Sequence, residues 1–287
     1  GLTLPFLVIY LCEVRGLGTT IGGLIVAYLA VITLLAAIPI GVLVDVLGPR
    51  RVMIAALFTA GSGVCALGFI TSTQGALIVA TVIAIGQAGI WSPQSALYAR
   101  VTPSEHRQKL FGLQFMLLNL GLGVGGLVAA VVVNVDEPAT FTRLYLLDSA
   151  TFAIYAIILL TLRGVGDGRP ASDALQGDAL QVGHLQLDGK AAGYSVLLRD
   201  RAMMRLLPAA LVLLVFGYGS LEVGLPVYAT VIGDLSVGFV GIAYAVNTGV
   251  IVISQLFVIK YLHGKSRSKT AAAVGLFWAI AWLLVGL

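Results

Sequence analysis

Two carboxylates lie inside long apolar stretches of the 287-residue chain. Glu222 stands in "LVLLVFGYGSLEVGLPVY" and Asp148 stands in "LYLLDSATFAIYAIILL". A carboxylate in apolar surroundings is costly to ionise, so it is protonated, hydrated or paired with a cation. Both acids are therefore candidates for binding a proton or a cation. The alternative is that each acid is hydrated near a segment end and only anchors it. For Glu222 the proton or cation site and the anchoring role are equally supported, whereas for Asp148 the anchoring role is favoured.

A second set of candidates consists of amide and aromatic side chains. Gln87, Trp91, Gln94 and Tyr98 recur at a spacing that places them on one face of a helix. Such a face could bind an amphipathic solute by hydrogen bonding and stacking. It could equally hold neighbouring helices together. The candidate substrate-cavity residues, all with this ambiguity, are Gln87, Trp91, Gln94, Tyr98, Asn119, Tyr218 and Asn247.

The elements that must position these residues are long apolar segments. Only 10% of the residues are charged, 59% are hydrophobic, and the mean hydropathy is +1.02, whereas a soluble protein carries about 25% charged residues. A bilayer core needs about 20 apolar residues in a helix. Eight segments reach or approach this length, and residues 1–11 form the end of another: 21–44, 52–72, 76–99, 110–133, 144–162, 206–229, 237–259 and 271–287. No alternating pattern of a barrel dominates. The sequence predicts an all-α, polytopic helical membrane protein.

The basic residues predict the orientation of these segments. If residues 1–11 run from inside to outside, all of the 17 Lys and Arg residues except Arg15 and Arg143 fall on the inside. This distribution follows the positive-inside rule and predicts a multi-pass protein of the cell membrane. Glu13 and Arg15 are then expected to be charges of an outer loop.

A polar stretch divides the chain into parts. We expect a bundle of six spans over 1–162, a cytoplasmic linker with a possible interfacial helix over 163–205, and three further spans over 206–287. A weak repeat agrees with two similar bundles, since "LPFLVIYL" at 4–11 is matched by "LPVYAT" at 225–230. Parallel repeats of this kind are typical of transporters.

Several other functions find no support in the sequence. The net charge of +4 is not gathered into a basic patch, so nucleic acid is not an expected partner. The three histidines fall in predicted loops, and no catalytic set, metal-ligand spacing or phosphate-binding loop occurs. Cys12 and Cys65 form no disulfide framework. We expect no enzyme activity, no metal and no cofactor.

The stretch "GVLVDVLGPRR" at 41–51 links the second and third spans on the predicted inner side. Its residues Gly41, Leu43, Asp45, Gly48, Arg50 and Arg51 resemble the signature loop of the Major Facilitator Superfamily in type, spacing and position. The stretch differs at Val46 and Pro49, where that family often has basic residues. A degenerate copy, "VIKYLHGKSRSK" at 258–269, follows the eighth span, as in the family.

The resemblance implies a fold of two bundles with six spans each. The N-terminal bundle would then be nearly complete and only three spans of the second would be present, so we expect a fragment. In the family this loop latches the inner ends of the two bundles together, with a partner in span eleven. Arg50, Arg51 and the backbone N–H groups of the Gly48-Pro49 turn would compensate the charge of Asp45 at its helix end. The alternative for Asp45 is a simple stop signal that pins the helix end at the interface.

The resemblance also implies a function. The family consists of secondary transporters that work by alternating access, and the chain is most similar to bacterial proton-coupled drug efflux carriers. It departs from them in "ATVIAIGQAG" at 80–89, which lacks their arginine, and in "NLGLGVGGLVAA" at 119–130, which lacks their proline. We expect a monomer in the lipid bilayer that moves a small-molecule substrate, driven by the proton gradient. The alternatives are uptake by proton symport and a sensor or scaffold that moves no solute.

Overall fold

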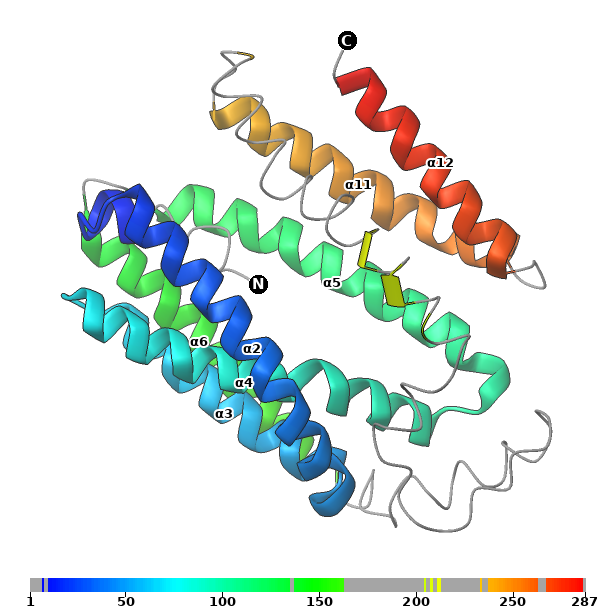
Figure 1. Ribbon diagram of the computed structural model, residues 1–287, viewed down its shortest axis with the longest axis horizontal. Coiled ribbons are helices and arrows are strands. Elements are labelled where there is room, and N and C mark those ends of the chain that lie inside the picture. The colour runs from blue at the N-terminus through cyan, green and yellow to red at the C-terminus, as the bar shows by residue number, and fades with distance from the viewer. Residues whose placement is uncertain are drawn as a thin grey trace. The chain divides into compact units, whose positions relative to one another are not determined.

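The computed structural model describes Leu7 and residues 10–134, 137–162, 204, 207–208, 211–212, 233, 237–262 and 267–285. The chain divides into two compact units, Gly1–Val182 and Gly183–Leu287, and each is treated by itself below. Among the described residues the regular elements are all helices (Figure 1). Glu222, Tyr218 and nearly all of the expected linker 163–205 and of the expected span 206–229 lie outside the described residues.

The first unit contains a short π-helix and five long α-helices: η1 (Tyr10–Val14), α2 (Thr19–Leu47), α3 (Pro49–Leu67), α4 (Thr73–Val101), α5 (Ser104–Val132) and α6 (Pro138–Thr161). Within the described residues, these five α-helices are long and apolar enough to cross a bilayer. The prediction of an all-α, polytopic helical membrane fold is confirmed.

Local sequence signals explain where these helices begin. Pro49 and Pro138 each stand in the first turn of their helix, where proline loses no hydrogen bond. The hydroxyl of Ser72 accepts a hydrogen bond from the backbone N–H of Gly75 and so caps α4. As a result α3 begins earlier than the predicted segment 52–72, and α6 begins six residues before the predicted segment 144–162.

The centre of the first unit is a close crossing of α3 and α4. These two helices pack together, α2 packs against α4, and α6 packs against α3 (Figure 1). A Cβ atom on Gly86 would lie 2.4 Å from the backbone nitrogen of Ala60, and one on Gly89 would lie 2.5 Å from the Cβ of Ala56. Small residues let two backbones approach this closely, which is how spanning helices gain packing energy without a hydrophobic driving force.

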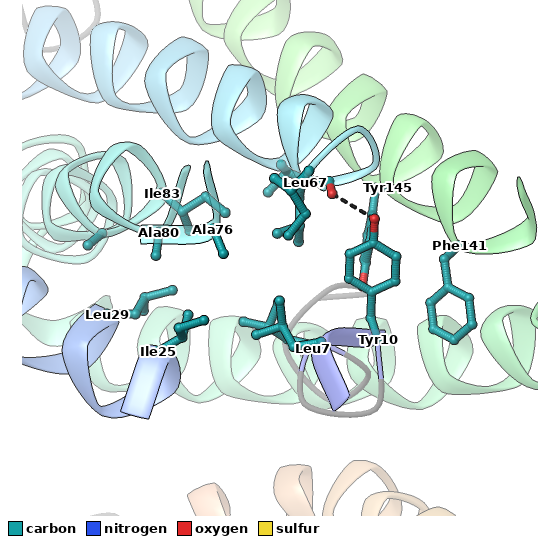
Figure 2. Packing of buried hydrophobic residues seen from close by; sticks show 14 residues of the cluster. Leu7, Tyr10, Ile25, Leu29, Leu67, Ala76, Ala80, Ile83, Phe141 and Tyr145 are labelled. Atoms are coloured by element: carbon teal, nitrogen blue, oxygen red, sulfur yellow. Dashed lines mark hydrogen bonds between the residues drawn. The ribbon is translucent and has the colours of Figure 1, made fainter. Parts of the chain in front are cut away.

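A large buried cluster joins η1 to the helices around it. Figure 2 shows Tyr10 beside Tyr145 and Phe141 of α6, with its hydroxyl directed at Leu67 of α3. The rings of Tyr10 and Tyr145 meet edge to face with centroids 5.0 Å apart, a favourable arrangement for aromatic pairs. The cluster continues through Ile25 of α2 and the small residues of α4. It fixes η1 against four of the long helices.

The second unit contains α11 (Val237–Leu262) and α12 (Arg267–Val285). They correspond to the predicted segments 237–259 and 271–287. Large apolar side chains such as Ile253 and Phe257 of α11 and Phe277 of α12 are about three-quarters exposed. Apolar exposure of this extent suits helices that lie in lipid.

Candidate functional site

The signature loop lies at the sharp connection between α2 and α3. Gly48 is the only residue between the two helices, and its φ of +86° is a conformation that favours glycine. Asp45 is exposed in the last turn of α2, and Leu43 is exposed as well. The dipole of α2 disfavours an acid at this end. Asp45 is therefore a charge that a partner group could stabilise.

Arg50 reaches from the start of α3 to the end of α6. Its Nε donates a hydrogen bond to the carbonyl of Leu159 at 3.0 Å, and its Nη2 donates to the carbonyl of Leu160 at 3.2 Å. These carbonyls belong to the last turn of α6, where a cation is favoured by the helix dipole. The sequence suggested Asp45 as the partner of Arg50 and gave no sign of these contacts. Leu159 and Leu160 lie 109 and 110 positions after Arg50, and no sequence pattern links residues so far apart.

Two further arginines also donate hydrogen bonds to backbone carbonyls at helix ends. Arg107 donates from Nη2 to the carbonyl of Ala99 at 3.0 Å and from Nε to that of Thr102 at 3.3 Å, at the end of α4. Arg15 donates from Nη2 to the carbonyl of Gly68 at 2.8 Å, directly after α3. Unpaired carbonyls are costly near a bilayer core, so these contacts stabilise the ends of the spans.

Arg15 lies directly after η1, outside the helices, and makes specific contacts that the sequence did not reveal. Its Nε donates to the hydroxyl of Tyr10 at 2.7 Å, and its guanidinium carbon lies 5.1 Å from the centroid of the Tyr10 ring. The Tyr10 hydroxyl in turn donates to the carbonyl of Leu67 at 2.9 Å. Thr142 of α6 donates to the carbonyl of Gly68 at 3.0 Å. Arg15 thus joins η1 to the end of α3 at the predicted outer side, and Thr142 attaches α6 to the same carbonyl.

Replacing Arg15 with methionine is expected to lower the free energy of unfolding by about 1–2 kcal/mol, since charge-assisted hydrogen bonds to Tyr10 and Gly68 are lost from a partly exposed site. Thermal unfolding of the purified protein in detergent measures the change. Arg143→Met is the matched control, because Arg143 lies on the same predicted side and is exposed. Equal shifts in the two variants would contradict the role of Arg15.

Asp148 is buried within the first unit. It is 2% exposed and lies ten residues after Pro138, which is about 15 Å along α6 from the start of the helix. The neighbouring Ser149 donates a hydrogen bond to the carbonyl of Gly61 at 2.9 Å, so this part of α6 is held against α3. The burial does not fit a hydrated anchor at a helix end. The distance of Asp148 from the outer boundary of the membrane stays a prediction from the sequence.

The face of α4 that carries Gln87, Trp91, Gln94 and Tyr98 is only partly exposed. Trp91 is 51% exposed, whereas Gln94 donates from Nε2 to the hydroxyls of Tyr98 and Tyr155, each at 3.1 Å. Gln114 of α5 donates from its Nε2 to the Oε1 of Gln94, also at 3.1 Å. These bonds match the interpretation of Gln94 as a residue that holds helices together. Gln87 is partly exposed on the same helix.

The remaining candidates are placed as follows. Asn119 donates from Nδ2 to the carbonyl of Phe115 at 2.8 Å, within its own helix. Asn247 is exposed on α11 in the second unit. In the first unit the structure thus brings Gln94 and Tyr98 together, while Asp148 and the loop at 41–51 occupy separate places. Among the described residues, no three His, Cys, Asp or Glu side chains gather as they would around a metal ion.

Tyr155 and Gln114 are polar partners that sequence reasoning missed. Each is a polar residue with apolar neighbours on both sides, and this is the only signal that could have found them. Their relation to Gln94 depends on how three helices face one another, which no spacing along one helix reveals.

Comparison with known proteins gives one positive finding. The family model described as Major Facilitator Superfamily matches residues 1–287. No curated protein and no solved structure matches.

Proposed function

The chain belongs to the Major Facilitator Superfamily and is a secondary transporter of that family; from this premise we propose that it exports small amphipathic compounds across the cell membrane in exchange for protons. Two bundles would expose a central site to each side of the membrane in turn. The proton gradient drives the cycle, and neither a metal nor a cofactor takes part. The chain would act as a monomer within the lipid bilayer.

The observation that carries the proposal is the burial of Asp148. Asp148 is 2% exposed on a helix that is long and apolar enough to span a membrane, and carboxyl groups within spanning helices commonly serve as proton sites. We propose that a change of conformation brings this group into contact with water, where it exchanges its proton. This coupling between conformation and protonation is what a proton-driven carrier requires. Glu222 is proposed as a second carboxyl group of the same kind.

The chemistry of α4 supports an amphipathic substrate. Trp91 and Tyr98 offer aromatic surface, and the Tyr98 hydroxyl and the partly exposed Gln87 amide offer uncharged hydrogen-bonding groups along one helix face. Such groups bind solutes that combine an apolar body with a few polar atoms. Asp45 is exposed at the end of α2 and is proposed to be one half of the latch that closes the inner side. The direction of transport is proposed from the resemblance to efflux carriers.

Transport by the protein expressed from its full open reading frame tests the proposal. Proteoliposomes with an acidic lumen should accumulate ethidium, a permanent cation that a pH gradient alone does not trap. Preloaded vesicles should also exchange labelled for unlabelled ethidium without any gradient. Accumulation only with an alkaline lumen would indicate symport. Absence of exchange would favour a sensor or scaffold. Protein-free vesicles are the control.

A further inference from the structure

A group of four polar side chains joins α4, α5 and α6. We call it the amide hub and define it as Gln94, Tyr98, Gln114 and Tyr155. Three hydrogen bonds of 3.1 Å connect them, all of which use the amide of Gln94. Gln94 donates both hydrogens of its Nε2 to tyrosine hydroxyls and accepts with its Oε1. An amide with its donors and its acceptor engaged has a fixed orientation.

The hub follows an interruption of α4. Pro93 is buried inside the helix and has no N–H, so the carbonyl of Gly89 has no hydrogen bond from residue 93. Up to Gly89 the helix is fixed by its close approach to Ala56 of α3. After Pro93 the segment 94–101 is held by the buried Leu97, which packs against α3 and α6, and by the polar contacts of the hub. The hub therefore contributes to where the second part of α4 lies and fixes its polar side chains.

The hub also holds one end of α5. Gln114 lies near the start of α5, where the rings of Phe111 and Tyr98 meet at a centroid distance of 6.4 Å. At the other end of α5, Ala129 packs against Leu144 of α6. The Gln114 bond is therefore one of the contacts that attach α5 to α4, together with the Tyr98–Phe111 ring contact and the bonds of Arg107 to the end of α4, and its loss would weaken that attachment.

We infer that Tyr155 and Gln114 are positioning residues for substrate recognition by α4. They fix the amide of Gln94 and, through it, the hydroxyl of Tyr98, on the face that carries the exposed Trp91. Neither needs to touch the substrate. The inference rests on the proposed function, since it assumes that this face of α4 binds the transported compound. It extends the binding determinants from one helix to three.

A double-mutant cycle tests this inference in the full-length protein. Tyr155→Phe and Gln114→Met remove one hydrogen bond each and keep the side-chain volume nearly constant. Each is expected to raise the Kd and the KM for ethidium about threefold to tenfold, while kcat changes less than about twofold. In a Gln94→Leu background Gln114→Met should have no further effect, because it acts through Gln94, and Tyr155→Phe should have a smaller effect than in the unaltered protein, because Tyr155 also contacts Tyr98 directly.

Tyr28→Phe is the matched control. The hydroxyl of Tyr28 pairs with that of Thr81 at 2.9 Å and so joins α2 to α4, away from the hub. Its loss should alter thermal stability without a change in Kd. Equal Kd shifts in the control and the hub variants, or additive effects in the Gln94→Leu background, would overturn the inference alone. Absence of ethidium binding and exchange by the unaltered protein would overturn the proposed function together with the inference.

Discussion

Gly86→Ala is expected to lower the free energy of unfolding of the first unit by about 3 kcal/mol or more, at the upper end of the cost of overpacking. The added Cβ would lie 2.4 Å from the backbone nitrogen of Ala60 and 2.6 Å from its Cα. Backbone atoms cannot rotate away as a flexible side chain can. The two helices must therefore separate, which weakens the packing on both sides of the crossing.

Gly121→Ala is the matched control for this prediction. Gly121 is in α5, and a Cβ placed there meets nothing within 4 Å among the described residues. Alanine is a better helix former than glycine by about 1 kcal/mol, so this substitution should leave stability unchanged or raise it. Thermal unfolding in detergent, followed by circular dichroism, compares the variants. A midpoint of Gly86→Ala equal to that of Gly121→Ala would contradict the close crossing.

Sequence reasoning identified the kind of fold because the bilayer imposes it. Long apolar runs must be helical in lipid, since every backbone polar group has to be paired within the segment. Helix ends were less well predicted. α6 begins at Pro138 although hydropathy placed its start at residue 144, because the polar and charged residues of its first turns lower the average without breaking the helix. The burial of Asp148 against the neighbouring helices could not be predicted from hydropathy either.

The closest helix contact could not be predicted from the glycines themselves. Gly121 and Gly125 of α5 stand four residues apart, a spacing typical of close helix crossings, yet Gly121 has open space beside it among the described residues. With 35 glycines in the chain, small residues at helical spacing occur in many places. A close crossing also requires a small residue on the facing helix. For Gly86 that residue is Ala60, which lies 26 positions earlier in the chain. That pairing is a property of the packed helices.

The groups that the arginine side chains bind could not be predicted from the sequence either. The distribution of lysine and arginine predicts the side on which a loop lies, but it does not say what a guanidinium binds. Arg15 and Arg50 both bind carbonyls at helix ends contributed by distant segments. A backbone carbonyl has no side-chain signature, so these contacts leave no pattern to read. The same holds for Tyr155, which meets Gln94 across 61 positions.

Asp148→Asn is expected to reduce proton-driven accumulation of substrate by about tenfold or more, while exchange of labelled for unlabelled substrate continues. Asparagine has nearly the shape of a protonated aspartate but neither binds nor releases a proton. A carrier with this change can still alternate between its two states with substrate bound. It can no longer use the gradient if Asp148 is the coupling group, because a buried carboxyl group is what links proton affinity to conformation.

Glu137→Gln separates this effect from a general loss of negative charge on α6. Glu137 immediately precedes the first turn of that helix and is exposed, so its neutralisation should leave accumulation unchanged. Both variants are compared in proteoliposomes by gradient-driven uptake and by exchange at equal pH. Loss of exchange as well as uptake in Asp148→Asn would assign the residue to folding or substrate binding. Unchanged uptake would exclude it from coupling, and the proton would then have to bind at another group, of which Glu222 is the next candidate.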